Sequence, residues 1–129
     1  MAKKCGNAIV HCIDFRFQDY LDEFMHSHGL NGDCDRISLA GGVKDIAVMY
    51  KEVEISHKLH HIDRIYLINH QDCGGYGLGD SISELEEKKF HAGELEKTRH
   101  FLNDLLPDVE IEAYFLTLNG EFIPLEDML

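Results

Sequence analysis

Apolar and polar residues follow one another along this chain in blocks that alternate between the spacing of strands and the spacing of helices. Short, mostly apolar runs at positions 8–13, 36–40 and 65–69 predict three buried strands, and the run at 109–118 predicts a fourth. The run at 65–69 is the strongest strand signal, because it is continuous and leads directly into His70.

Between these runs, apolar side chains recur every three or four residues, as they do on one face of a helix. This spacing predicts a helix over about 20–28 that Gly29 ends, and a second helix whose apolar face runs from Val43 to Val53. A third helical region covers about 82–106, before Pro107. It begins with a charge run that we interpret as a solvated helix face, made by Glu84, Glu86, Glu87, Lys88 and Lys89.

The order of these elements, strand and helix in turn, predicts the α/β fold class. We expect a three-layer α/β/α architecture around a mostly parallel, four-stranded sheet. The 129 residues, of which 44% are hydrophobic, contain no internal repeat and no linker. A chain of this size builds one core, so we expect residues 1–129 to form a single domain.

Two polar strings stand where predicted strands end, and they carry the candidate chemistry. Cys12 closes the first strand, and His70 and Cys73 follow the third strand in the pattern HxxC. Because the carboxyl ends of parallel strands meet at one edge of a sheet, we expect these three side chains to converge. Two thiolates and an imidazole are donors that zinc prefers, and three protein ligands leave a fourth position for water. The sequence therefore predicts a Zn²⁺ site of the catalytic type.

Asp14 and Arg16 follow Cys12 at alternate positions. In an extended segment alternate side chains face the same side, so these three residues can project into one cavity. An ordinary ion pair in a loop is the alternative interpretation. We favour a functional pair, because a candidate metal ligand lies two residues away.

The remaining motifs indicate structure rather than chemistry. The glycine-rich stretch 74–79 lacks the GxGxxG spacing of a dinucleotide-binding loop, and we expect its backbone to pass close to the metal and direct amides at the Cys73 sulfur. His11 should pack on the opposite face of its strand, and Cys5 and Cys34 should be plain thiols.

Net charge and hydropathy indicate which kinds of partner the protein binds and in which compartment it lies. The formal net charge of −12 opposes phosphate backbones, so we expect no nucleic acid partner. No stretch approaches the roughly twenty apolar residues of a membrane span, and no apolar signal region follows the first basic residues. We therefore expect a cytoplasmic protein, in a compartment where cysteines stay reduced and can serve as metal ligands.

The two polar strings resemble the metal-binding motifs of the β-class carbonic anhydrases. The matching patterns are CxDxR and HxxCG, at Cys12, Asp14, Arg16, His70, Cys73 and Gly74. Weaker matches are an Ala-Gly turn at Ala40 and Gly41 and a later turn at Gly120 and Glu121.

The chain also departs from the pattern of that family. Phe15 stands where a small residue is usual, Ser38 and Gly42 replace the usual Arg and Asn, and the helical arm that usually precedes the first strand is missing. The chain therefore is similar to a short, divergent branch described as putative carbonic anhydrases.

The resemblance implies a β-carbonic-anhydrase fold and the reversible hydration of carbon dioxide to bicarbonate by zinc-bound hydroxide, with zinc on Cys12, His70 and Cys73. It implies that Asp14 either pairs with Arg16 and accepts a hydrogen bond from the hydroxide, or becomes the fourth zinc ligand. A homodimer or higher homo-oligomer is implied as well. Because two thiolates cancel the charge of the metal, we expect activity to rise toward alkaline pH.

Two other functions stay open at the level of sequence. A zinc hydrolase of the same fold would act on carbonyl sulfide or carbon disulfide, and the shape of the pocket rather than the sequence distinguishes it. The other alternative is a non-catalytic zinc-binding or sensory domain. Phe15 favours this alternative, whereas the retained pair of Asp14 and Arg16 speaks against it.

Overall fold

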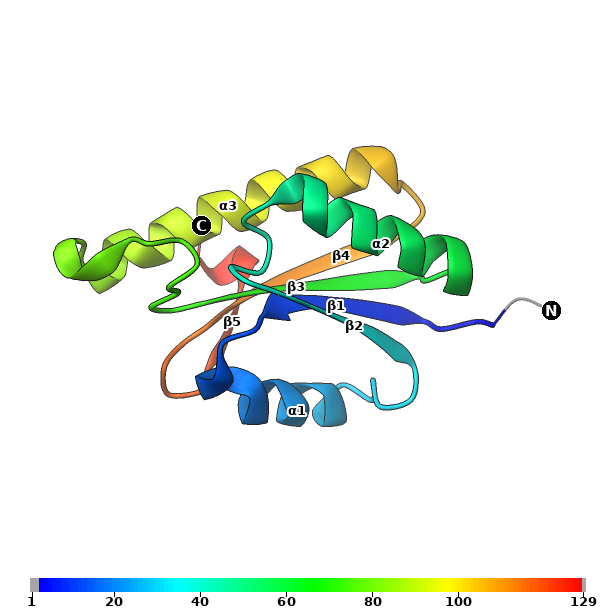
Figure 1. Ribbon diagram of the computed structural model, residues 1–129, viewed down its shortest axis with the longest axis horizontal. Coiled ribbons are helices and arrows are strands. Elements are labelled where there is room, and N and C mark those ends of the chain that lie inside the picture. Colours follow the sequence, from blue (N-terminus) through cyan, green and yellow to red (C-terminus); the bar gives the residue numbers. More distant parts are fainter. Residues whose placement is uncertain (1–2, 129) are drawn as a thin grey trace.

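The computed structural model describes residues 3–128 and contains a five-stranded sheet with helices on both faces (Figure 1). The strands are β1 (Asn7–Cys12), β2 (Cys34–Leu39), β3 (Arg64–His70), β4 (Glu110–Leu116) and β5 (Phe122–Pro124). They lie in the order β2-β1-β3-β4-β5, in which the first four are parallel and β5 runs antiparallel to β4.

Three helices complete the layers. They are α1 (Gln18–Ser27), α2 (Ile46–His60) and α3 (Glu84–Leu105), and short 3₁₀ segments lie at Phe15–Phe17, Gly79–Ser81 and Leu125–Asp127. The α1 helix covers one face of the sheet, whereas α2 and α3 lie side by side on the other (Figure 1). Within the described residues, no helix combines the length and the apolar content that crossing a membrane requires.

The α/β class, the three layers and the mostly parallel sheet are as predicted. The predicted strands and helices are all present, with ends shifted by a few residues. The prediction of a four-stranded sheet is corrected by β5, which the hydrophobic pattern did not reveal. This strand has only 3 residues, all half-buried, and it ends at Pro124. An edge strand that short offers no alternation of apolar and polar residues to detect.

The strands β1 and β3 lie in the middle of the sheet and are buried on both faces. On one face, Val10 and Leu67 pack with Met49 of α2 and Leu95 of α3. The other face packs against Phe24 of α1 and its neighbours. This double burial explains why both strands are nearly continuous apolar runs in the sequence.

The carboxyl ends of β1 and β3 lie next to each other at one edge of the sheet. The two strands pair in parallel, with Val10 opposite Leu67. Cys12 is the last residue of β1 and His70 is the last residue of β3. The loops that follow both strands therefore leave the sheet at the same edge, where α/β proteins build their sites.

Side chains fix the start of the two helices that follow β2 and β3. Asp45 caps α2 by accepting a hydrogen bond from the backbone N–H of Val48. Ser83 and Glu86 form a reciprocal capping box at the start of α3. The capping box fixes where α3 begins, and Glu87 in its first turn accepts a hydrogen bond from the backbone N–H of Asp72, in the loop that follows His70.

Candidate metal centre

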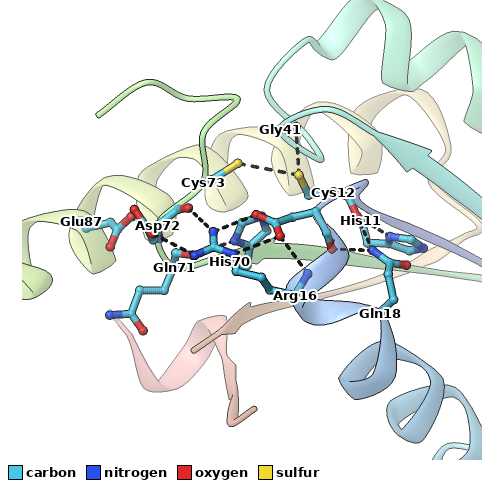
Figure 2. Close-up of polar contacts among 11 residues, drawn as sticks. His11, Cys12, Arg16, Gln18, Gly41, His70, Gln71, Asp72, Cys73 and Glu87 are labelled. Carbon is cyan, nitrogen blue, oxygen red and sulfur yellow. Dashed lines mark hydrogen bonds and ion pairs between the residues drawn. The ribbon is translucent and has the colours of Figure 1, made fainter. Parts of the chain in front are cut away.

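Three side chains converge at the carboxyl edge of the sheet: Cys12, His70 and Cys73. One ligand atom of each lies within 4.8 Å of the others. All three side chains are buried, and the two sulfur atoms are 3.9 Å apart (Figure 2). The structure thus brings together the three residues that the sequence predicted to converge.

The spacing of these atoms fits a zinc ion. Two sulfur atoms that bind one tetrahedral zinc at about 2.3 Å lie about 3.8 Å apart, and the observed separation is 3.9 Å. In His70, Nδ1 lies 2.7 Å from the backbone oxygen of Gln71 and donates its proton there. The other ring nitrogen, Nε2, is buried and has no hydrogen-bond partner within the part of the chain that the structure describes. A lone pair fixed in this way is the usual state of a histidine that binds a metal.

The two thiols interact strongly with each other. Contact with Cys73, together with the nearby His70 and the N–H of Gly41, lowers the pKa of Cys12 despite its burial. Contact with Cys12 and burial raise the pKa of Cys73. The backbone N–H groups of Tyr76 and Gly75 lower it, by a smaller amount. A divalent cation that binds both sulfur atoms would require both thiols to lose their protons.

Two glycine turns bring backbone close to the sulfur atoms. The N–H of Gly41 lies 3.4 Å from the Cys12 sulfur. A Cβ atom on Gly75 would lie 2.8 Å from the nitrogen of Gly41, so the turn after β2 and the loop after Cys73 touch at their backbones. A side chain at position 75 would push the Gly41 amide away from the sulfur.

Asp14 lies beside the candidate ligand atom of His70, and Arg16 holds it there. The carboxylate accepts hydrogen bonds from Nη2 of Arg16 at 2.8 Å and from Nε at 3.1 Å. One carboxylate oxygen is 3.9 Å from Nε2 of His70. The Arg16 guanidinium lowers the pKa of Asp14 to about 2, so this side chain is a carboxylate at neutral pH.

Asp72 is a residue of this region that the sequence analysis missed. Its carboxylate accepts a hydrogen bond from Nη1 of Arg16 at 3.0 Å, and its backbone oxygen accepts one from Nη2 at 2.9 Å (Figure 2). The backbone of Asp72 has a φ of +58°, and its N–H donates to Glu87 of α3 at 2.7 Å. Glu87 is therefore not part of a purely solvated face. The position of Asp72 inside the HxxC string was the only available signal.

Other side chains near the centre have mainly structural contacts. His11 is buried, and its ring lies 2.9 Å from the backbone oxygen of Cys12 and 3.5 Å from Arg36. Among residues 3–128, Phe15 is the most exposed large apolar residue, at 85%, and Ile13 is exposed at 59%. Ile13 and Phe15 stand on either side of Asp14 in the segment between β1 and α1. Cys5 and Cys34 lie outside the cluster of possible metal ligands.

Comparison with solved structures shows the fold. The chain aligns with a carbonic anhydrase from Glaciozyma antarctica with a TM-score of 0.67 and 22% identity, over 95% of this chain and 83% of the other. A carbon disulfide hydrolase aligns with a TM-score of 0.64 and 17% identity, over 92% and 77%. A tetrameric β-carbonic anhydrase from Sordaria macrospora aligns with a TM-score of 0.62 and 13% identity, over 95% and 81%.

Comparison of sequences shows the family. An uncharacterized protein from Rickettsia conorii is 28% identical over 130 residues, which covers 91% of this chain and 70% of the relative. Residues 2–126 match the profile of the family described as "Putative carbonic anhydrase". This match spans nearly the whole sequence, from before β1 to the last 3₁₀ segment, and it includes both strings that carry the candidate metal ligands. The chain therefore belongs to the putative carbonic anhydrase family.

Proposed function

We propose that this protein is a zinc enzyme that hydrates carbon dioxide reversibly to bicarbonate. The observation that carries the proposal is the arrangement around His70. Its Nε2, which has no hydrogen-bond partner among the described residues, converges with the sulfur atoms of Cys12 and Cys73. The Asp14 carboxylate, which is bound by Arg16, lies 3.9 Å from that nitrogen. Membership of the carbonic anhydrase-like family supports this function.

Cys12, His70 and Cys73 would hold the zinc ion, which leaves a fourth position in a tetrahedral site. Zinc supplies a Lewis acid that makes water a nucleophile at moderate pH. The residues of the chain contribute position and charge. The two sulfur atoms neutralise the metal, and the N–H of Gly41 stabilises the negative charge on Cys12.

Asp14 acts as a hydrogen-bond acceptor in this proposal. Its pKa of about 2 means that it stays ionised and offers an acceptor to the hydrogen of a nucleophilic water. The bonds from Arg16 hold the carboxylate at 3.9 Å from Nε2 of His70. Without them, Asp14 would be free to turn toward a zinc ion on the three ligands and to replace water there.

A zinc hydrolase of carbon disulfide or carbonyl sulfide is the second candidate. The likeness to a carbon disulfide hydrolase favours it, because both substrates are linear like carbon dioxide and would need the same ligands. The same protein preparation should be assayed with all three substrates. A non-catalytic zinc-binding or sensory role is the third candidate. It gives no function to the ion pair between Asp14 and Arg16, whose atoms are 2.8 Å apart.

Metal content and hydration together test the proposal. Protein made in zinc-supplied cells should contain one zinc per chain, and stopped-flow measurements should detect carbon dioxide hydration. Cys73→Ser should lose the zinc, whereas Cys5→Ser, which changes a thiol outside the cluster, should keep it. Intact protein without bound metal would contradict the zinc site. Zinc-loaded protein that hydrates no carbon dioxide at any pH would exclude the carbonic anhydrase function.

Assembly and compartment are part of the proposal. A homodimer would cover the exposed side chains of Phe15 and Ile13, which lie next to the candidate centre. Sedimentation at micromolar concentration should show a species larger than the 14.8 kDa chain, and a single species of that mass would contradict a dimer. We place the protein in the cytoplasm, where two cysteine ligands stay reduced.

A further inference from the structure

Asn69 lies directly before His70 on β3 and is buried, with an exposed fraction of 2%. Its side-chain oxygen lies 3.4 Å from the backbone N–H of Val43, in the turn after β2. Its side-chain nitrogen lies 3.1 Å from the hydroxyl of Tyr76 and 3.0 Å from Nδ1 of His91. One amide therefore joins β3 to the turn after β2, to the loop after Cys73 and to α3.

The contacts of Asn69 fix the direction of its amide. A backbone N–H only donates, so the oxygen of the amide must face Val43 and the nitrogen must face Tyr76 and His91. Burial, and then the nearby His70, lower the pKa of His91 to about 4, so its ring is neutral at physiological pH and accepts at Nδ1. The amide of Asn69 thus has one orientation that suits these three contacts.

The oxygen of Asn69 occupies space that a side chain at position 42 would need. Gly42 has a φ of +60°, and a Cβ atom there would lie 2.8 Å from that oxygen and 3.1 Å from the backbone oxygen of Ile68. The neighbouring residue, Gly41, directs its N–H at the Cys12 sulfur at 3.4 Å. The amide of Asn69 therefore holds the turn whose backbone contacts the sulfur.

The same amide reaches the segment that carries the second thiol. Tyr76, which the Asn69 nitrogen contacts, donates its backbone N–H to the oxygen of Cys73 at 3.2 Å. His91 closes the arrangement from α3, and its aromatic ring lies 4.9 Å from that of Tyr76. The backbone around both cysteines is thus tied to a single buried side chain.

We propose that Asn69 is a positioning residue of the metal centre, which sets the Gly41 amide and the Cys73 loop at the distances that the two thiolates require. This inference rests on the zinc site of the proposed function, and it adds a residue that binds neither metal nor substrate. Residues that orient metal ligands in this way typically change metal affinity by about 10- to 100-fold when they are replaced.

The first test uses Asn69→Ala and measures metal affinity by competition with a chelator, for zinc and for cobalt(II). The affinity should fall by about 10-fold or more, and the absorption band between thiolate and cobalt should shift. Asn103→Ala changes an exposed asparagine on α3 and should leave both measurements unchanged. Equal affinity and an unchanged cobalt spectrum in Asn69→Ala would overturn the proposal.

The second test separates positioning from a general loss of folding. Gly42→Asn alone should weaken metal binding, because its Cβ meets the Asn69 oxygen at 2.8 Å, although asparagine tolerates a φ of +60°. In the double variant with Asn69→Gly, the amide can enter the same space from position 42. The double variant should then bind metal more tightly than either single variant, since the two sites are coupled, and less tightly than the intact protein, because the Cβ at position 42 still lies 3.1 Å from the backbone oxygen of Ile68. A double variant that binds no more tightly than Asn69→Gly alone would overturn the proposal.

A third measurement distinguishes this inference from the proposed function. In metal-free protein, hydrogen exchange of the Gly41 amide should be faster in Asn69→Ala than in the intact chain, whereas exchange in the middle of β4 should not change. If the intact protein binds no metal, the zinc function fails and this exchange rate alone decides the inference. Unchanged exchange at Gly41 would overturn the role of Asn69 even in a protein that binds zinc and hydrates carbon dioxide.

Discussion

Arg16 binds Asp72 through two separate contacts, one to the carboxylate at 3.0 Å and one to the backbone oxygen at 2.9 Å. The same guanidinium holds Asp14 beside His70. Arg16 therefore joins the loop after β1 to the loop after β3, and its position depends on both. Asp72, which lies between His70 and Cys73 in the sequence, therefore helps to position Arg16. Arg16 in turn positions Asp14.

Replacing Arg16 should separate metal binding from catalysis. In Arg16→Ala the Asp14 carboxylate loses its ion pair and keeps only the hydrogen bond from the backbone N–H of residue 16, at 2.9 Å. It can then turn toward the fourth position, so we expect the protein to keep zinc and to lose carbon dioxide hydration. Elemental analysis and stopped-flow hydration on the same sample measure this. Arg64→Ala, which removes an ion pair with Glu110 away from the centre, should keep both zinc and activity. Full activity in Arg16→Ala would contradict the role of the pair.

Replacing Asp72 should have a smaller effect of the same kind. Asp72→Asn removes the ion pair with Arg16 but keeps the backbone oxygen that also binds it. Both side chains are partly exposed, and an exposed ion pair contributes up to about 1 kcal/mol, so activity should fall by about fivefold at most. Stopped-flow rates at several salt concentrations measure this, because salt should weaken the intact pair and narrow the difference. A loss as large as that in Arg16→Ala would show that Asp72 does more than hold Arg16.

Activity should increase with pH through the neutral range. Two thiolates would neutralise the charge of a zinc ion in the proposed site, so water bound there should lose its proton about one to two units above the pH of about 7 known for zinc on three neutral histidines. We expect hydration to approach its maximum near about pH 8 to 9. Stopped-flow rates across pH, with zinc content measured at each value, test this. A rate that is constant from acidic to alkaline pH would contradict it.

Acid should destabilise the fold partly through His91. Burial and the nearby His70 lower the pKa of this side chain from 6.5 to about 4. The unfolded chain therefore binds a proton in that interval that the folded chain does not, and the free energy of unfolding should fall as the pH decreases from 6.5 to 4. The contribution of His91 is about 3 kcal/mol at most.

Denaturant unfolding of metal-free protein at several pH values measures this contribution. His91→Gln should unfold with a weaker dependence on pH than the intact chain in the same interval. His100→Gln changes a histidine whose side chain is 82% exposed, so it should leave the dependence as it is. An identical pH dependence in His91→Gln would show that other groups carry the effect.

The sequence was sufficient to predict where the candidate ligands meet. Cys12 and His70 end two apolar runs, and the parallel pairing of such runs determines which edge of the sheet they share. Cys73 then follows from its spacing to His70. This inference needs only the order of the elements, so it tolerates errors in their exact ends.

The hydrogen bonds around these candidate ligands could not be predicted from the sequence. The bond from Asp72 to Glu87 joins a loop to a helix turn, and the left-handed backbone of Asp72 has no signal as clear as a glycine. Asn69 was read as the end of an apolar strand, although its amide links four segments. Such contacts depend on how the layers pack, which local patterns do not encode.

The different placement of the candidate ligands has a consequence for the way a bound metal would enter and leave. Cys12 and His70 end the central strands, whose opening requires most of the sheet to separate, whereas Cys73 lies in the loop after β3. Exchange of a bound metal should therefore begin with release of Cys73, while Cys12 and His70 keep their places. The rate of exchange should then depend on the opening of one short loop and not on unfolding of the sheet.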